Sequence, residues 1–118
     1  MKIYSEERPW GRFEKFHENM MSTVKLIYII PNQRLSLQYH ANRNEFWRII
    51  RGSAEVEIDG QTFNVKEGDD ISIHSKSRHR IKALANGCNV LEISYGHFDE
   101  DDIVRIEDDF NRIDHSPP

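Results

Sequence analysis

The strongest constraint on the fold lies mid-chain, where a strictly alternating segment runs into an Asp-Gly pair. In residues 54–58 three apolar side chains alternate with two glutamates. This period of two is typical of a β-strand with one buried face. The pair Asp59-Gly60 follows, a favoured sequence for a two-residue hairpin turn, and residues 62–65 return as a second strand. The segment therefore predicts antiparallel β-structure.

Further strand-like segments occupy much of the remaining chain. They are residues 24–30, 47–51, 71–73, 80–84 and 90–93. Turn-forming residues bound them: Pro31-Asn32, Gly52, Gly68-Asp69 and Asn86-Gly87. Because no helical segment separates these strands, the pattern predicts an all-β fold, an antiparallel sandwich or barrel.

The acidic C-terminal region, residues 99–110, admits two interpretations. Ile103, Ile106 and Phe110 would share one face of a helix, but residues 103–106 also fit a strand. The acids of residues 99–102 are expected to form a solvated face. At 118 residues the chain predicts one domain, 1–118, with a core of about residues 8–112 and a flexible tail, 113–118.

Composition and charge exclude several classes of partner. The chain has no apolar run near the ~20 residues that a membrane span needs, and its N-terminus lacks an apolar signal core. A net charge of −4 argues against a nucleic-acid partner. The single cysteine, Cys88, excludes an intramolecular disulfide and fits a reducing compartment. We therefore expect a cytoplasmic protein that binds neither nucleic acid nor membrane.

Four polar residues have the spacing of a metal site. Gln38 and His40 are two apart, so on a strand they point to the same face. Glu45 begins the next strand-like run, and His79 lies near the start of a later one. Two imidazoles, a carboxylate and an amide oxygen suit Zn²⁺, Co²⁺, Ni²⁺, Mn²⁺ or Fe²⁺, and offer too few oxygens for Ca²⁺. Each residue alone could be an exposed polar side chain, but their joint spacing predicts a metal site.

The metal set lies within a pattern that resembles the two sequence motifs of the cupin superfamily. The first motif, G-x5-H-x-H-x3,4-E-x6-G, is matched in spacing by Asn32, Gln38, His40, Glu45 and Gly52. The second, G-x5-P-x-G-x2-H-x3-N, is matched in spacing by Gly68, His74, Lys76, His79 and Ala83. The resemblance implies a single-domain cupin, an antiparallel double-stranded β-helix or jelly-roll barrel.

Within the cupins, the chain is most similar to the type II phosphomannose isomerases. The segments that carry this likeness run in order along the chain: Arg8-Pro9-Trp10-Gly11, Leu35-Ser36-Leu37-Gln38, Arg43-x-Glu45-x-Trp47, Glu67-Gly68-Asp69, His79-Arg80 and Glu100-Asp101-Asp102-Ile103-x-Arg105. The resemblance identifies Gln38 as a metal ligand. It also implies interconversion of mannose 6-phosphate and fructose 6-phosphate, supplying polysaccharide or nucleotide-sugar synthesis, with one divalent ion, zinc being the first candidate.

This chemistry requires cations for a phosphate and a group that moves a proton. Arg43, Arg105 and Arg80 are the candidates for binding the sugar phosphate, with Lys76 in reserve. Strand alternation argues against Arg80 as a phosphate-binding residue, because its side chain points out of the pocket if that of His79 points inward. Glu92 lies mid-strand and is the candidate for proton transfer. The alternative for Glu92 is an exposed polar position on the sheet. Arg105 is a second catalytic candidate.

Several positions depart from the family pattern. The chain has Ala41, Asn42, Phe46 and Ser94 where the family usually has polar or histidine side chains. The alternative function is therefore a metal-binding cupin that holds a small sugar-like ligand without converting it. We expect Trp10 and Trp47 to pack in the core or pocket wall. We also expect a homodimer, because a second copy would cover edge strands and the apolar N-terminal residues.

Overall fold

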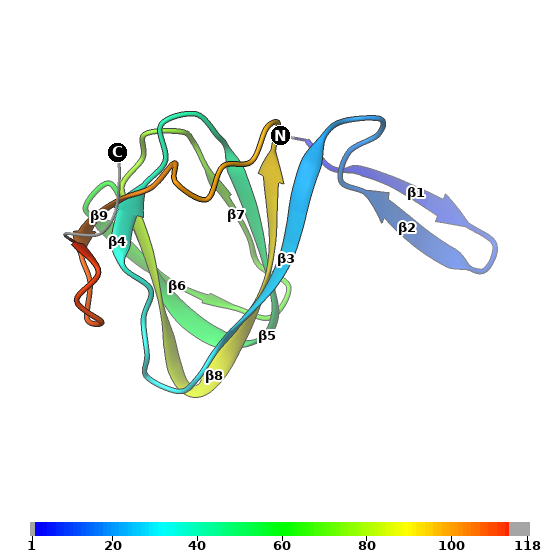
Figure 1. Cartoon of the computed structure of the whole chain (residues 1–118). Helices are drawn as coiled ribbons and strands as arrows, with labels where there is room; N and C mark the ends of the chain where they lie inside the picture. Colours follow the sequence, from blue (N-terminus) through cyan, green and yellow to red (C-terminus); the bar gives the residue numbers. More distant parts are fainter. Residues whose placement is uncertain (1, 114–118) are drawn as a thin grey trace.

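The computed structural model describes residues 2–113, and in that range it contains strands and no α-helix (Figure 1). The strands are β1 (Tyr4–Arg8), β2 (Gly11–Lys15), β3 (Ser22–Ile29), β4 (Leu37–Tyr39), β5 (Glu45–Ile58), β6 (Gln61–Lys66), β7 (Asp70–Ile73), β8 (His79–Tyr95) and β9 (Val104–Glu107). The expected all-β antiparallel fold is confirmed. Residues 2–113 also contain no helix long and apolar enough to cross a membrane. The expected flexible tail, apart from Ile113, lies outside the described residues.

Seven strands form one antiparallel sheet that folds over on the two long strands, β5 and β8 (Figure 1). In one half of this sheet, which we call the β3 half, the order is β7-β5-β8-β3. In the other, the β4 half, the order is β6-β5-β8-β4-β9. The sheet thus closes round one core as a jelly-roll barrel. The Asp59-Gly60 hairpin joins β5 to β6 as predicted, with φ of 48° and 85° at its two turn residues.

Two glycines that were expected to end strands instead bend them. Gly52 lies within β5 and Gly87 within β8, with φ of 82° and 76°, and both strands continue. The expected strand end at Gly52 and the expected turn at Asn86-Gly87 are therefore wrong. The physical reason is that turns and bends use the same positive φ, and here the pairing of β5 with β8 resumes beyond a register shift next to Gly52.

Gly52→Ala should strongly destabilise the barrel. A Cβ at position 52 would lie 2.1 Å from the carbonyl oxygen of Gly87. Gly60→Ala is a matched control, because Gly60 also has positive φ but has open space around its would-be Cβ. We expect the control to lose about 1–2 kcal/mol of unfolding free energy and Gly52→Ala about 3–5 kcal/mol. Urea unfolding of both variants checks this, and equal losses would contradict it.

Of the two interpretations of the C-terminal region, the strand is confirmed and the helix is wrong. Residues 104–107 form β9, which pairs with β4. Arg80 fixes this strand to β8, since its guanidinium donates to the Glu107 carboxylate at 3.0 Å and to the Glu107 carbonyl at 3.2 Å. Pairing with β4 therefore outweighs the helical pattern of Ile103, Ile106 and Phe110.

The first two strands form a hairpin that stands off the barrel (Figure 1), which the sequence did not predict. We call β1 and β2 the arm. Trp10 lies at its tip and is 73% exposed, so the expected core or pocket-wall position is wrong for Trp10. It is confirmed for Trp47, which is 1% exposed in the core.

The apolar interior of the barrel ends in polar side chains. On β5, Glu45 shares the inward face with buried Trp47 and Ile49. On β8, His79 likewise shares a face with Ile81, which is also buried. The same alternation that builds the core therefore places a carboxylate and an imidazole at one end of it.

Candidate metal centre

Three side chains converge at this end of the barrel. His40, Glu45 and His79 are 1–3% exposed, and one potential ligand atom from each lies within 4.8 Å of the others. Glu45 Oε1 is 3.3 Å from His40 Nε2 and 3.7 Å from His79 Nε2. The sequence placed these residues on three separate segments, and the strand pairing brings them together.

Backbone carbonyls orient both imidazoles. His40 Nδ1 lies 2.7 Å from the Asp102 carbonyl oxygen, and His79 Nδ1 lies 2.8 Å from that of Ser77. A carbonyl only accepts, so each Nδ1 carries a hydrogen, and the Nε2 of each ring is the nitrogen that faces Glu45. His79 Nε2 and Glu45 Oε1 are buried and have no hydrogen-bond partner. Lone pairs that face one another in this way fit a divalent cation.

The electrostatics of the cluster favour an ionised Glu45. Burial by itself would raise the pKa of Glu45, but the contact with His40 and the charge of Arg43 outweigh it and lower the pKa to about 2. Burial lowers the pKa of His79, which favours the neutral, metal-binding form of this ring. Ser94 Oγ donates to Glu45 Oε2 at 2.9 Å and so leaves Oε1 for the cluster.

Gln38 lies beside the cluster on β4. It pairs across the strands with His79 on one side and with Arg105 on the other, so the three side chains share a face. Its amide nitrogen is 3.4 Å from His40 Nε2, and its Oε1 accepts a hydrogen bond from Ser36 Oγ at 2.5 Å. To coordinate a metal through oxygen, the amide has to turn over, which would leave its nitrogen facing Ser36.

The four predicted cationic residues occupy different positions. Arg43 is buried against the cluster, where its Nε donates to Glu45 Oε2 at 3.1 Å and one Nη donates to the Asp99 carbonyl at 3.0 Å. Arg105 is partly buried beside Gln38. Arg80 points away from the cluster and binds Glu107, and Lys76 is exposed in the turn after β7. Arg43 and Arg105 are thus the cations that the structure brings to the metal set.

Glu92 has the interior position considered for it. It is 7% exposed, and Trp47 Nε1 donates to its Oε2 at 2.9 Å. The same indole contacts the His79 ring, with 5.7 Å between ring centroids, and therefore links Glu92 to the cluster. Burial raises the pKa of Glu92, and the negative charge of Glu45 raises it further. A carboxyl group with a raised pKa beside a metal set is suited to accept and return a proton.

Asp102 is the functional residue that the sequence did not reveal. It was expected to belong to a solvated acidic face, but it is buried. Its carboxylate accepts hydrogen bonds from the backbone N–H of Ala41 at 2.8 Å and of Asn42 at 3.0 Å, while its carbonyl holds His40. The acidic composition of residues 99–102 hid this role. The only available signal was the place of Asp102 in the Glu-Asp-Asp-Ile segment.

Asp102→Asn should weaken metal binding by about 10-fold to 100-fold, because it disturbs the groups that position His40. Asp101→Asn is the matched control, since Asp101 is exposed next to it and carries the same charge. Metal affinity measured by competition with a chromogenic chelator checks this. Equal affinities for the two variants would contradict the positioning role.

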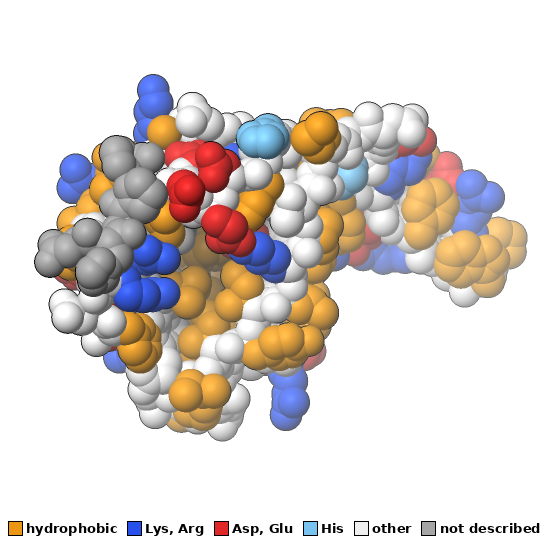
Figure 2. All heavy atoms as spheres, in the orientation of Figure 1, with side chains coloured by type: hydrophobic (Ala, Val, Ile, Leu, Met, Phe, Trp, Pro, Cys, Tyr) orange, Lys and Arg blue, Asp and Glu red, His pale blue; other side chains and the backbone are white. Residues whose placement is uncertain are grey.

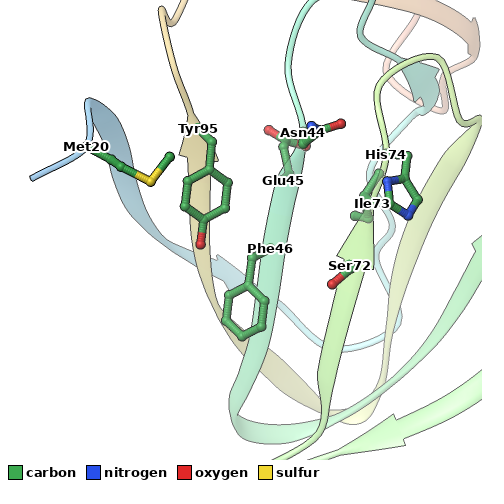
Figure 3. Close-up of a pocket in the computed structure, with 8 residues that line it drawn as sticks. All are labelled: Met20, Asn44, Glu45, Phe46, Ser72, Ile73, His74 and Tyr95. Atoms are coloured by element: carbon green, nitrogen blue, oxygen red, sulfur yellow. The ribbon is translucent and has the colours of Figure 1, made fainter. Parts of the chain in front are cut away.

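A hollow next to the cluster is lined by Glu45 and by residues of the outer face of the sheet (Figure 3). Phe46 pairs with Ser72 across β5 and β7, and both point opposite to their inward-facing neighbours. Met20 and Tyr95 line one side of the hollow, and Ser72 and His74 line the other (Figure 3). His74, which falls within the second cupin motif, therefore lies outside the metal cluster.

Comparisons with known proteins agree with this arrangement. Residues 2–108 match the family described as mannose-6-phosphate isomerase C-terminal. The alginate biosynthesis protein AlgA of Pseudomonas aeruginosa is 37% identical over 110 residues, covering 89% of this chain and 22% of AlgA. The mannose-1-phosphate guanylyltransferase ManC of Salmonella typhimurium is 32% identical over 108 residues, covering 90% of this chain and 22% of ManC. The chain thus spans less than a quarter of the length of these relatives.

Among solved structures, oxalate decarboxylase from Bacillus subtilis superposes with a TM-score of 0.66 at 28% identity, over 74% of this chain and 24% of that one. Another structure of the same enzyme concerns its Mn(II) centres. These likenesses confirm the cupin fold. They also show that a related cupin domain carries metal, as the His-Glu-His cluster of this chain could.

Proposed function

Because this chain belongs to the mannose-6-phosphate isomerase C-terminal family of cupins, we propose that it interconverts mannose 6-phosphate and fructose 6-phosphate with one divalent metal ion, zinc being the first candidate. The observation that carries the proposal is the buried convergence of His40, Glu45 and His79, with lone pairs facing one another. Gln38 would complete the ligand set. The product would feed nucleotide-sugar or polysaccharide synthesis in the cytoplasm.

The reaction moves the carbonyl from C1 of the open-chain sugar to C2. One proton has to move from C2 to C1, and the hydroxyl proton on O2 has to move to O1. When bound, the metal would polarise the carbonyl oxygen as a Lewis acid. Glu92 is the residue we assign to the proton, because it is buried beside the cluster and its pKa is raised. Trp47 holds its Oε2, which leaves Oε1 to receive the C2 proton and return it to C1.

The phosphate would be bound by Arg105. This guanidinium lies on the strand next to Gln38 and shares its face. Arg43 has a different role in the proposal, since its hydrogen bonds to Glu45 and to the Asp99 carbonyl fix the carboxylate and the segment that crosses the cluster. A ring contact from Phe98, 4.4 Å from the Arg43 guanidinium, holds this cation in place.

The second candidate is a metal-binding cupin that holds a small sugar-like ligand without converting it. The departures from the family pattern at Ala41, Asn42, Phe46 and Ser94 favour this alternative. Turnover therefore distinguishes the two candidates.

The test loads the protein with Zn²⁺ or Co²⁺ and measures formation of fructose 6-phosphate from mannose 6-phosphate in a coupled assay. Formation supports the isomerase, and binding of the sugar phosphate without conversion supports the alternative. Arg105→Ala should weaken mannose 6-phosphate about 10-fold to 100-fold more than mannose, as expected for loss of a charge-assisted bond to phosphate. Calorimetric titration with both sugars checks this, and equal losses would contradict the assignment of Arg105.

A further inference from the structure

β3 carries one charged residue, Lys25, and its side chain faces into the barrel. Lys25 pairs across the strands with Glu92 of β8, which in turn pairs with Trp47 of β5. Directly paired residues share a face, so Lys25, Glu92 and Trp47 form one inward-facing row across three strands. Burial raises the pKa of Glu92, and the charge of Lys25 acts in the opposite direction. Lys25 is therefore a cation beside the residue that we assign to proton transfer.

The barrel is open on the side where β3 lies. Within residues 2–113, β3 pairs with β8 alone, and no pairing joins it to β4 or β9 across the opening. A cavity of about 330 Å³ lies here, within the size range of small-molecule sites. Ile27 and Ile29 line it from the inward face of β3, which they share with Lys25, and Leu35 lines it from the segment before β4. Figure 2 shows the opening, with hydrophobic side chains inside it and basic and acidic side chains around its rim.

The partners of Lys25 lie on the segment that joins β8 to β9. This segment, residues 96–103, crosses the opening at the end of the barrel that holds the cluster (Figure 1). Lys25 Nζ lies 3.2 Å from Glu100 Oε1 and 4.6 Å from the centre of the Phe98 ring. The guanidinium of Arg43 lies 4.4 Å from the centre of the same ring. Because Arg43 lies against the cluster, a single aromatic ring separates Lys25 from the surroundings of the metal set.

The ion pair between Lys25 and Glu100 is accessible to water. The Glu100 side chain is 76% exposed and that of Lys25 is 39% exposed. Ion pairs this accessible contribute little to stability, so another anion can replace the carboxylate at small cost. A phosphate monoester carries more negative charge than a carboxylate and has three strong acceptor oxygens. Glu100 thus occupies a place on Lys25 that suits a phosphate group.

We propose that Lys25 binds the phosphate of the sugar phosphate, in addition to Arg105; the proposal rests on the function proposed above. Lysine binds phosphate as a point charge, and a single guanidinium balances only part of a dianion. β8 lies between β5 and β3 in the sheet, so Glu92 lies between Glu45 and Lys25. A hexose phosphate with C1 and C2 next to the cluster and Glu92 can therefore direct its C6 phosphate towards Lys25 and the opening. On binding, Lys25 exchanges Glu100 for the phosphate.

The test compares mannose 6-phosphate with mannose by calorimetric titration of the Zn²⁺-loaded chain. Lys25→Met removes the charge from a side chain of similar size, so it should weaken mannose 6-phosphate about 10-fold to 100-fold more than mannose. Lys25→Arg should keep the affinity for mannose 6-phosphate within about threefold. Lys66→Met is the matched control, because Lys66 is exposed on β6, and it should bind both sugars as the wild type does. Glu100→Gln should bind mannose 6-phosphate about twofold to fivefold more tightly, because it removes the competing charge.

Calorimetry measures binding without turnover, so the result for Lys25 does not depend on whether the chain isomerises the sugar. Circular dichroism and metal content verify that each variant folds and holds its ion, and Glu100→Gln tests the same exchange without altering Lys25. Equal losses for both sugars in Lys25→Met, or weaker mannose 6-phosphate binding by Glu100→Gln, would overturn the proposal. A wild type that does not bind mannose 6-phosphate would overturn it too. Failure of the isomerase, in contrast, appears as bound mannose 6-phosphate that yields no fructose 6-phosphate.

Discussion

His79→Ala should reduce bound metal from one ion per chain to less than about a tenth of an ion under conditions that saturate the wild type, as a lost ligand in a small donor set implies. His40→Ala should do the same. Each replacement removes one of the lone pairs that face Glu45 Oε1 at 3.3–3.7 Å, and leaves this buried carboxylate oxygen with one imidazole neighbour fewer. Isomerisation should fall to background in both variants.

His74→Ala is the matched control for this experiment. His74 is an exposed histidine in the second cupin motif, and it lines the outer hollow and is not part of the His40, Glu45 and His79 group. It should keep the full metal content and activity. Elemental analysis after dialysis measures all three variants. Wild-type metal content in His40→Ala and His79→Ala would show that the ion binds elsewhere.

Glu92→Gln should lower kcat by about 10²-fold to 10⁴-fold, the usual contribution of a positioned general base, while metal content stays at one ion per chain. The amide oxygen of Gln can still accept the hydrogen of Trp47 Nε1, so the packing around residue 92 is kept. KM should change little, because the sugar and its phosphate keep their binding groups. A fall in kcat smaller than about threefold would contradict the role of Glu92.

The unfolding free energy of Glu92→Gln provides a second readout. Because burial and Glu45 raise the pKa of Glu92 in the folded state, the folded chain binds more protons than the unfolded chain once pH rises past about 4.5, and stability falls there. Gln does not titrate, so the variant should be at least as stable as the wild type at pH 7. A residue with only a structural role would instead lower stability and leave kcat near its original value.

Much of the fold was predictable because strand formation here depends on local alternation. The Asp59-Gly60 hairpin and the start of β5 at Glu45 follow from neighbouring residues alone. The bends at Gly52 and Gly87 were not predictable, because a glycine with positive φ either ends a strand or bends it. Which of these occurs depends on the pairing of β5 with β8, and therefore on residues distant in the sequence.

The candidate site, like the fold, was only partly predictable from the sequence. The spacing of His40, Glu45 and His79 predicted that they bind one metal ion. This was possible because the alternation of side chains along a strand and the cupin pattern are both defined by distances along the sequence. Asp102 could not be found from its own neighbourhood, since a buried aspartate and a solvated one have the same acidic neighbours. Its role arises only when residues 99–102 cross the barrel end and meet His40, 62 residues earlier in the chain.

The most direct test of a catalytic metal at this cluster is a titration of the metal-free protein with Zn²⁺ or Co²⁺ while conversion of mannose 6-phosphate to fructose 6-phosphate is followed by NMR. We expect the rate to rise in proportion to added metal and to level off at one ion per chain. Chelation should abolish the rate, and restored metal should recover it. A chain that binds its ion and converts no mannose 6-phosphate would contradict the isomerase proposal. It would instead support a metal-binding cupin that holds a small sugar-like ligand without converting it.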